Sequence, residues 1–323
     1  MLYWRNDNLA YCAPSLRLAL QPSACRQSKT LTEVQKGKSM PLLSTILTRH
    51  FLASIVYLCL ANRDCMRSLK MFFVALALLH NSYGQETTSK SIDKIIFVAG
   101  DAFEDSKPFI KYVASLTHKT NPKICLIPTA SADNPYAIVA WYASCVDLHI
   151  RPYVMRTFLS ASPSQQTFEE LILSMDAIIV GGGNTLNMLG VWKAQGIDTV
   201  LKKAYDKGIV LSGGSAGSLC WFRSGYSDSR PKEMTIIDGL GFLNFSHSPH
   251  YNSQPERRPL FQQGILSGKL KPGYACDDLA GLLFINGSLT KSVSQNAQNN
   301  SYFVSVVDGK IVEKLLLCEV IKE

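Results

Sequence analysis

The chain has 323 residues, of which 46% are hydrophobic and 18% are charged, a composition typical of a globular protein with one large or two small domains. The formal net charge of +8 comes almost wholly from residues 1–84, which hold 10 basic and three acidic residues. The remainder holds 23 basic and 22 acidic residues, so its charge gives no basis for binding nucleic acid or an anionic membrane surface.

Residues 66–84 have the parts of a secretory signal peptide. Arg67 and Lys70 form a basic start, residues 71–79 form an apolar core, and small residues precede a cleavage point before Gln85. The alternative interpretation of this segment is a short buried helix. With the signal in use we expect a secreted or periplasmic protein, and otherwise a cytoplasmic one.

A signal peptide lies at the N-terminus of a protein, but residues 1–65 precede this one. Their apolar stretch 41–61 contains Arg49, and an arginine at the bilayer centre costs roughly 2.5–3.5 kcal/mol, so we expect no stable membrane span in the mature form. We expect translation to start at Met66 or Met71 and residues 1–65 to be a non-native or disordered extension. A membrane-anchored extension is the alternative.

We expect residues 90–323 to form a single catalytic α/β domain, because apolar runs that predict strands alternate there with segments of helical spacing. The predicted strands are 95–100, 124–128, 153–158, 177–180 and 209–211, and the predicted helices are 104–118, 135–148, 168–175 and 186–205. This alternation predicts a parallel sheet with helices on both faces. Sites in such sheets form at the carboxyl ends of the strands.

The glycine-rich stretch Gly213-Gly214-Ser215-Ala216-Gly217 follows the last of these strands and precedes residues that could begin a helix. A strand, a sharp turn with a serine at its apex and a helix form a nucleophile elbow. The glycines two before and two after Ser215 would give room where side chains would collide with the neighbouring strand and helix. The alternative is a glycine-rich turn that cradles a phosphate.

Beyond residue 222 the pattern changes to short strand-like pieces, 274–275, 281–284, 302–307 and 310–317. Asp308-Gly309 between the last two is a hairpin signal. We interpret these pieces as antiparallel strands that finish the edge of the sheet, and not as a second domain. Apolar residues on the last hairpin could serve a homodimer interface.

A serine nucleophile needs a histidine base, and the base needs an acid to orient it. Four histidines follow residue 85, of which His118 and His149 end helices at the far edge of the predicted sheet. His247 and His250 remain, in a polar loop downstream of the elbow, and position does not choose between them.

Six acids could orient the base, namely Asp228, Glu233, Asp238, Glu256, Asp277 and Asp278. Asp228 lies in a polar loop after the elbow. Asp277 and Asp278 are adjacent in a strand-like segment, so their side chains should point to opposite faces and at most one can face the site.

Five cysteines follow residue 85, and they are widely spaced among apolar residues without a CxxC pair. We therefore expect buried free thiols, with no zinc site and no disulfide framework. We also expect no metal and no other cofactor.

Several ordered motifs resemble the peptidase E family, serine peptidases of the S51 type that include aspartyl dipeptidases. The motifs are GGGNT at 181–185, GGSAGSLCWF at 213–222, SPHY at 248–251, PERRP at 255–259 and GYACDD at 273–278. The resemblance runs from about residue 94 to the C-terminus. It implies a flavodoxin-like sheet like that of class I glutamine amidotransferases. Cyanophycinases are more distant relatives.

Carried over by position, the resemblance implies that Ser215 is the nucleophile and that His250 is the base. For the acid we prefer Asp228, with Asp277 or Asp278 as the alternative. The oxyanion hole would combine the N–H of Ala216 with that of Gly182 or Gly183. The implied substrate-binding residues are Asn184, Arg257 and Arg258, where the arginines could meet an acidic first residue of the substrate.

The resemblance therefore implies a serine peptidase that hydrolyses small peptides, dipeptidase-like and with Asp-X dipeptides as one candidate substrate. Two alternatives remain open, a cyanophycinase-like or other amide hydrolase on the same fold, and a non-catalytic binding protein. One departure from the family is Gly100-Asp101-Ala102, where relatives tend to have a glycine-rich turn after the first strand.

Overall fold

The computed structural model describes residues 92–321 except 160, 161 and 163, and these residues belong to one compact unit, Ser89–Glu323. The expectations for residues 1–65 and 66–84 concern residues outside this range. Among the helices that the structure describes, none is both long and apolar enough to cross a membrane.

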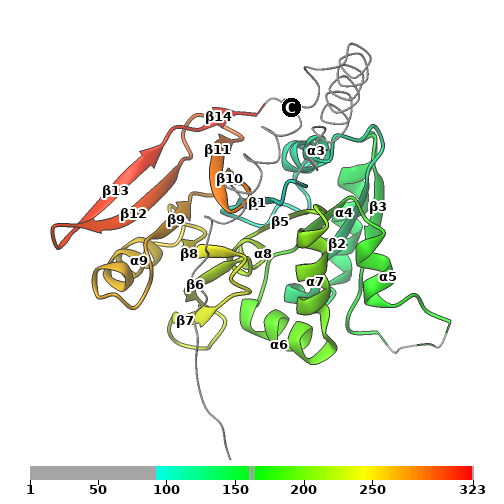
Figure 1. Cartoon of the computed structure of the whole chain (residues 1–323), viewed down its shortest axis with the longest axis horizontal. Helices are drawn as coiled ribbons and strands as arrows, with labels where there is room; N and C mark the ends of the chain where they lie inside the picture. Colours follow the sequence, from blue (N-terminus) through cyan, green and yellow to red (C-terminus); the bar gives the residue numbers. More distant parts are fainter. Residues whose placement is uncertain (1–91, 160–161, 163, 322–323) are drawn as a thin grey trace, which may run out of the picture. The chain divides into compact units, whose positions relative to one another are not determined.

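The larger of two sheets has eight strands (Figure 1). Its strands are β1 (Ile95–Ala99), β2 (Lys123–Ile127), β3 (Arg151–Val154), β4 (Ala177–Val180), β5 (Val210–Gly214), β10 (Ala280–Ile285), β11 (Ser288–Ser294) and β14 (Glu319–Val320). The strand order is β14-β11-β10-β1-β5-β4-β2-β3, and the last five are mutually parallel. β10 pairs with β1 in the antiparallel sense and so extends this sheet beyond its parallel part.

Helices cover both faces of the parallel part. They are α3 (Lys107–Leu116), α4 (Pro135–Cys145), α5 (Phe168–Leu173), α6 (Thr185–Gln195), α7 (Ile197–Asp206) and α8 (Ala216–Leu219). On one face Phe97 of β1 packs with side chains of α3 and α4, and on the other Leu211 of β5 packs with α6 and α7. The predicted α/β class, a mostly parallel flavodoxin-like sheet with helices on both faces, is confirmed.

The predicted helix 186–205 is two helices in the structure. Gly196 lies between α6 and α7 with a φ of +71°, a left-handed conformation that glycine adopts without steric cost. The break lets α6 and α7 take different directions, so both can place apolar side chains on the same face of the sheet.

The second sheet has six strands, and it corrects the interpretation of the late strands as edge strands only. Its strands are β6 (Phe222–Ser227), β7 (Thr235–Asp238), β8 (Leu243–Ser248), β9 (Gly273–Cys276), β12 (Ser301–Val307) and β13 (Lys310–Leu316), in the order β13-β12-β9-β8-β6-β7. Only the predicted strand 281–284 joins the large sheet, as part of β10. Local sequence pattern predicts a strand but not its partner, because pairing is set by contacts distant in sequence.

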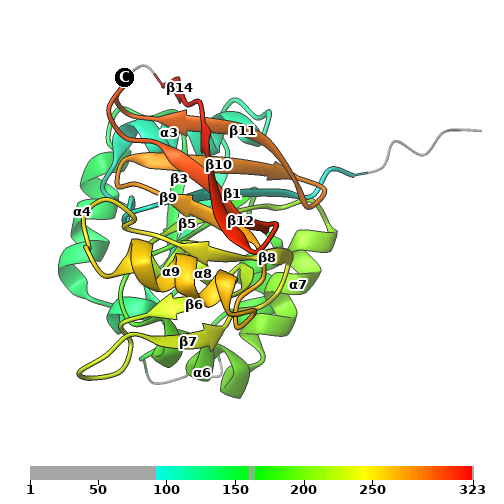
Figure 2. The ribbon, with the colours of Figure 1, turned by 90° about the vertical axis from the view of Figure 1, so that its left-hand side faces the viewer.

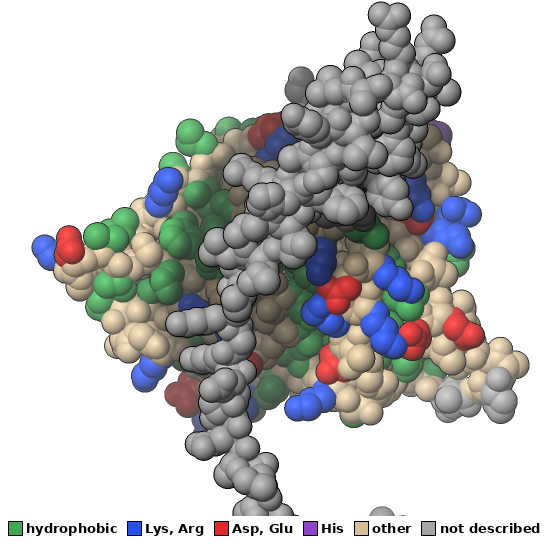
Figure 3. Space-filling view, viewed as in Figure 1, with side chains coloured by type: hydrophobic (Ala, Val, Ile, Leu, Met, Phe, Trp, Pro, Cys, Tyr) green, Lys and Arg blue, Asp and Glu red, His purple; other side chains and the backbone are tan. Residues whose placement is uncertain are grey.

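The last hairpin forms as predicted. β12 and β13 pair from Ser301↔Leu316 to Val307↔Lys310 around Asp308 and Gly309, which both have positive φ angles. Figure 3 shows hydrophobic side chains on this hairpin, where Val307 and Leu315 are about half exposed. A homodimer interface at this surface stays a prediction.

Aromatic side chains join the two sheets. Phe222 of β6 and Tyr274 of β9 both pack edge-on against Phe284 of β10, with ring centroids 5.7 and 5.1 Å apart. Burying each such side chain contributes roughly 1.5–3 kcal/mol. Helix α9 (Arg257–Leu266) lies against the six-stranded sheet (Figure 2). The loop before α9 and the loop between β9 and β10 are thereby held near the carboxyl ends of the parallel strands.

Candidate active site

Ser215 occupies the apex of a strand–turn–helix unit, between β5 and α8. Its φ of 54° and ψ of −118° are unusual for a residue with a side chain, and such strain costs of order 1–3 kcal/mol. The nucleophile-elbow geometry predicted for this stretch is therefore present. Strain of this kind persists only where the surrounding structure enforces it.

Gly213 and Gly217, two residues before and after Ser215, are required because a side chain at either position would collide with neighbouring backbone, as the sequence predicts. A Cβ atom on Gly213 would lie 2.3 Å from the carbonyl oxygen of Gly217, at the start of α8. A Cβ atom on Gly217 would lie 2.1 Å from the carbonyl oxygen of Val180, at the end of β4. Any side chain at either position would push the elbow away from its neighbouring strand or helix.

His250 and Asp278 complete a hydrogen-bonded chain with Ser215. The Oγ atom of Ser215 lies 2.8 Å from Nε2 of His250, and Nδ1 of His250 lies 2.8 Å from Oδ1 of Asp278. Because the carboxylate only accepts, Nδ1 carries the proton, and Nε2 is free to accept a proton from the serine. This arrangement can activate a hydroxyl group as a nucleophile.

The Asp278 carboxyl group is held in its ionised form. Burial raises its pKa, but hydrogen bonds from His250 and Ser253, with the charges of His250 and Arg257, outweigh burial and leave the pKa below its ordinary value. The backbone N–H of Asp278 donates to Oδ1 of Asn252 over 2.9 Å. An ionised, fixed carboxylate behind the imidazole is what a general base needs for its orientation.

The prediction that Asp228 is the orienting acid is wrong, because Asp278 and not Asp228 is hydrogen-bonded to His250. The Asp228 side chain is 58% exposed, and its nearest charged partner is Arg257, with Oδ1 3.6 Å from Nη2. Asp228 lies in a loop after the elbow, as the sequence predicts, directly after β6, but its side chain faces solvent and Arg257, while Nδ1 of His250 is bound to Asp278. The alternative acid, Asp278, takes that place.

Asp277 is bound to other partners than His250, and the two acids lie between β9 and β10, where Asp278 is part of a turn. The Oδ2 atom of Asp277 accepts from the backbone N–H of Asn300 at 2.9 Å and from the hydroxyl of Tyr302 at 3.4 Å. Burial raises the pKa of Asp277, and the hydrogen bonds from Asn300 and Tyr302 lower it less. Of the two adjacent acids, only Asp278 reaches the imidazole.

The candidate oxyanion donors surround Ser215. A Cβ atom on Gly182 would lie 3.5 Å from Cβ of Ser215, so this backbone passes directly beside the serine. Gly183 has a φ of +133°, a conformation open to glycine, and a Cβ atom there would lie 2.3 Å from the carbonyl oxygen of Ala130. Ala216 begins α8, and the first N–H groups of a helix have no acceptor within it.

The three candidate substrate-binding side chains all have partners within the protein. Asn184 caps α6 and donates to the carbonyl oxygen of Ser229. Arg258 pairs with Glu313. Arg257 is only 3% exposed and donates to the Gln254 side chain and to the Tyr226 carbonyl, with N–O distances of 2.6 and 3.0 Å.

Two acidic side chains lie close to the triad instead. Oδ1 of Asp101 accepts from the N–H of Leu279, next to Asp278, and burial raises the pKa of Asp101 by more than this hydrogen bond lowers it. Burial also raises the pKa of Glu104. A hydrogen bond from the Gly182 N–H lowers this pKa, but by less than burial raises it. The sequence placed Glu104 at the start of a helix and gave no signal that it turns toward the glycine-rich loop.

His247, the second candidate base, lies inside the core. It stacks on Phe222 with ring centroids 4.4 Å apart, and its ring nitrogens lie 3.0 Å from Oγ of Ser218 and from the Tyr274 carbonyl oxygen. The carbonyl only accepts, so Nδ1 donates to Tyr274, and the one hydroxyl proton of Ser218 serves either Nε2 of His247 or the Ser215 carbonyl oxygen, which lies 2.7 Å from Oγ of Ser218. Burial lowers the pKa of His247 from 6.5 to about 3, so the ring stays neutral in the folded protein.

This buried histidine predicts a loss of stability in acid. Between pH 6.5 and about 3 the unfolded chain binds one proton more than the folded chain at His247, so the free energy of unfolding falls as the pH is lowered through this range. The loss is about 1.4 kcal/mol per pH unit while only the unfolded state is protonated. Urea unfolding of wild type and His247→Gln at pH 7, 6, 5 and 4 measures it. The stability difference between the two proteins should shrink with acidity, and a constant difference would contradict the prediction.

The five cysteines of the described region are all free thiols. Cys125, Cys145, Cys220 and Cys276 are buried and Cys318 is partly exposed. Burial raises the pKa of Cys125 to about 12, so this thiol stays protonated and unreactive at neutral pH.

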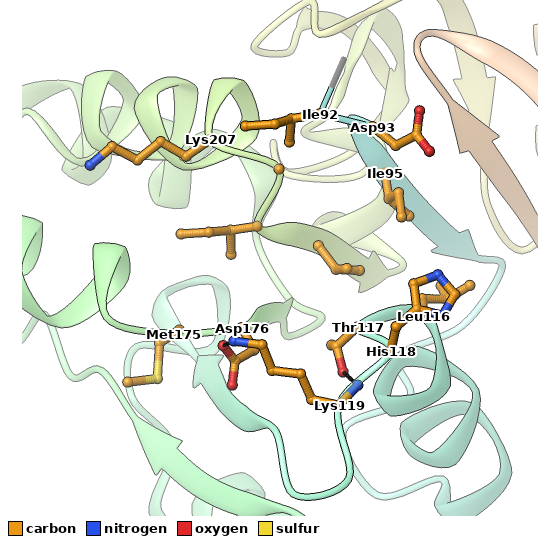
Figure 4. A pocket seen from close by; sticks show the side chains of 13 residues that line it. Ile92, Asp93, Ile95, Leu116, Thr117, His118, Lys119, Met175, Asp176 and Lys207 are labelled. Atoms are coloured by element: carbon orange, nitrogen blue, oxygen red, sulfur yellow. Dashed lines mark hydrogen bonds and ion pairs between the residues drawn. The ribbon is translucent and has the colours of Figure 1, made fainter. Parts of the chain in front are cut away.

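A cavity of about 440 Å³ lies at the amino ends of the parallel strands of the large sheet (Figure 4). Its lining precedes β1, β2, β4 and β5 and includes Ile92, Leu116 and Lys207, while Lys119 is paired with Asp176 at 2.5 Å. It therefore lies at the amino ends of the strands, away from Ser215 at their carboxyl ends.

Comparisons with known proteins agree with the motifs. The model of peptidase family S51 matches residues 95–292. The uncharacterized peptidase YgaJ of Bacillus subtilis is 36% identical over 223 residues, 68% of this chain and 95% of its own length. The uncharacterized peptidase Lin0382 of Listeria innocua is 24% identical over 66% of this chain and 93% of its own length. The crystal structure of a peptidase from an acI-B1 Actinobacterium has the same fold, with a TM-score of 0.56, 15% identity, and coverage of 71% of this chain and 96% of its own.

Proposed function

The chain belongs to peptidase family S51, and from this premise we propose that it is a serine peptidase that hydrolyses short peptides through an acyl-enzyme on Ser215. The observation that carries the proposal is the hydrogen-bonded chain from Ser215 through His250 to Asp278. Family membership supports peptide-bond hydrolysis, and the geometry of these three residues supports the serine mechanism.

In the proposed reaction Oγ of Ser215 attacks the carbonyl carbon of the peptide bond, and Nε2 of His250 takes the serine proton. Asp278 stabilises the imidazolium that forms. The negative charge on the carbonyl oxygen is stabilised by the backbone N–H groups of Ala216 and Gly183, because the Gly182 N–H is hydrogen-bonded to the Glu104 carboxylate. His250 then returns the proton to the leaving amine. A water molecule, activated by the same histidine, hydrolyses the ester and restores Ser215.

We propose dipeptides as substrates, but two observations weigh against a preference for an acidic first residue. Arg257 and Arg258, the candidate cations, are engaged with partners inside the protein. Asp101, whose carboxyl group accepts from the N–H next to Asp278, puts a further acidic side chain beside the triad. We therefore expect this chain to differ from the aspartyl dipeptidases that its sequence resembles.

A substrate comparison tests this expectation. At pH 8 we expect kcat/KM for Asp-Ala to be severalfold lower than for Ala-Ala, because the acidic side chain of the substrate would be repelled by acidic side chains beside the triad. Asp101→Asn should narrow the difference, whereas the exposed neighbour Asp105→Asn should leave it unchanged. A higher kcat/KM for Asp-Ala in the wild-type protein would overturn the expectation.

Labelling tests the proposed chemistry itself. A fluorophosphonate probe should attach to Ser215, with the adduct located by peptide mass spectrometry and hydrolysis of dipeptides lost in parallel. A chain that neither labels nor hydrolyses any of a panel of peptides of two to five residues would contradict the proposal and favour a non-catalytic binding protein.

A further inference from the structure

The hairpin β12–β13 follows the part of the chain that the family model matches, which ends at residue 292. It nevertheless contacts both loops that carry members of the candidate triad. The polar contacts between β13 and the loop after His250 converge on a single side chain, Glu313.

The side chain of Glu313 is only 14% exposed and binds several polar groups at once. Its carboxylate accepts from the Tyr251 hydroxyl at 2.7 Å, from Nε2 of Gln262 at 2.9 Å and from two guanidinium nitrogens of Arg258, Nε at 3.2 Å and Nη2. Three of these donors reach Oε2 and one reaches Oε1, so the carboxylate is held through both of its oxygens. Burial raises its pKa, but these hydrogen bonds outweigh burial and leave the pKa below its ordinary value.

Tyr251, the residue directly after His250, is held at both ends. Its hydroxyl is bound by Glu313, and its backbone N–H donates to the carbonyl oxygen of Cys276 over 3.0 Å. Its ring is 3% exposed, and the Arg258 guanidinium lies 5.3 Å from its centroid. The aromatic side chain therefore has little freedom while Glu313 is in place.

His250 depends on such anchoring because its own backbone is strained. Its φ is 53°, in the left-handed region that residues with side chains rarely adopt. A conformation of this kind lasts only where neighbouring contacts enforce it. Backbone contacts that hold this residue include the His250 N–H to the Gly100 carbonyl and the Gln254 N–H to the His250 carbonyl, both at 3.2 Å, and the two ends of Tyr251 hold the next residue.

The acid of the triad is supported from the same part of the chain. Just before β12, Asn300 makes two hydrogen bonds with Asp277. The backbone N–H of Asn300 donates to Oδ2 of Asp277, and the backbone carbonyl of Asn300 accepts from the Asp277 N–H, both at 2.9 Å. The side-chain amide of Asn299 donates to the carbonyl oxygen of Asp278. The residues after the family match thus brace His250 and Asp278 from one side.

We propose that the β12–β13 hairpin clamps the catalytic loops and that Glu313 is the positioning residue that holds His250 against Ser215 through Tyr251. The inference rests on the proposed function. Glu313 touches neither Ser215 nor the imidazole, so it acts on the reaction only through Tyr251. If Tyr251 is released, residue 250 can relax toward an ordinary φ, which displaces the imidazole from Oγ.

Two variants test the clamp with minimal disturbance. Tyr251→Phe removes one hydroxyl group, and Glu313→Gln keeps the shape of the side chain but removes its charge and rearranges its hydrogen bonds. We expect each to lower kcat about 10- to 100-fold with KM changed by no more than about threefold, because a displacement near 1 Å at the reacting atoms has effects of this size. The double variant should lose no more than the worse single variant, since both break the same contact. The exposed neighbour Lys314→Gln is the control and should match the wild type.

A second readout does not depend on turnover. The proton shared by Nδ1 of His250 and Asp278 should give a downfield NMR signal in the unliganded protein, identified by its loss in Asp278→Asn. The signal should shift or broaden in Tyr251→Phe and Glu313→Gln and stay unchanged in Lys314→Gln. Wild-type kcat and an unchanged signal in both variants would overturn the clamp while leaving the peptidase proposal intact. Absence of hydrolysis and of fluorophosphonate labelling in the wild type would instead refute the peptidase proposal, and the NMR signal would still decide the clamp.

Discussion

Ser215→Ala should lower kcat for peptide hydrolysis by roughly 10⁴- to 10⁶-fold, the loss typical of a serine nucleophile. No neighbouring side chain can replace the attacking oxygen, because the strained elbow presents only residue 215 to the imidazole. Backbone N–H donors would remain and would supply the residual rate. The measurement is steady-state hydrolysis of Ala-Ala with protein checked for traces of wild type.

The fold should survive this substitution. Alanine occupies the same left-handed conformation as serine and loses only one hydrogen bond, so we expect the melting temperature to change by only a few degrees. Ser267→Ala, at an exposed position after α9, is the control and should keep wild-type activity. If Ser215→Ala retained more than about a tenth of wild-type kcat, the acyl-enzyme mechanism would be wrong.

Asp278→Asn should have the second largest effect, a fall in kcat of about 10³- to 10⁴-fold. An amide in place of the carboxylate can donate to Nδ1, which favours the imidazole tautomer that carries its proton on Nε2. That tautomer cannot accept the Ser215 proton. The substitution also removes the charge that stabilises the imidazolium. Hydrolysis of Ala-Ala, with folding checked by circular dichroism, measures the effect.

Asp228→Asn is the matched comparison, since it makes the same chemical change at the other candidate acid. Asp228 is more than half exposed and has no contact with His250, so we expect kcat within about threefold of wild type. The reverse result, a large loss in Asp228→Asn and a small one in Asp278→Asn, would show that the acid in the working enzyme is not the one that contacts the imidazole here.

Local features of the site could be predicted from sequence. The elbow was predictable because its strand, its glycines and its serine are contiguous, so the motif can be recognised without knowing that Val180 of β4 is the neighbour that Gly217 must avoid. The Asp308-Gly309 hairpin was predictable for the same reason. The prediction that at most one of Asp277 and Asp278 reaches the site holds, but its reason does not, because Asp278 lies in a turn after β9 and not in an extended strand.

Features that depend on strand pairing could not be predicted. Asp228 follows β6 and His250 follows the neighbouring parallel strand β8, yet nothing near Asp228 reveals that its side chain turns to solvent and to Arg257 and not to His250. The same holds for Glu104, which turns toward Gly182 instead of starting a helix. The engagement of Arg257 and Arg258 was hidden as well, because their partners Tyr226 and Glu313 lie 31 and 55 residues away in the chain.

The triad draws on both sheets, and this has a consequence for biosynthesis. Ser215 follows β5 of the large sheet, His250 follows β8 of the small one, and Asp278 lies in the link from β9 to β10. A nascent chain whose parallel strands have folded while the rest is still being made would display the serine without a base or an acid. Such a precursor would be chemically silent. Reactivity toward fluorophosphonate would then appear only when the segments that carry His250 and Asp278 have docked beside Ser215. Incompletely folded molecules would be unable to hydrolyse peptides.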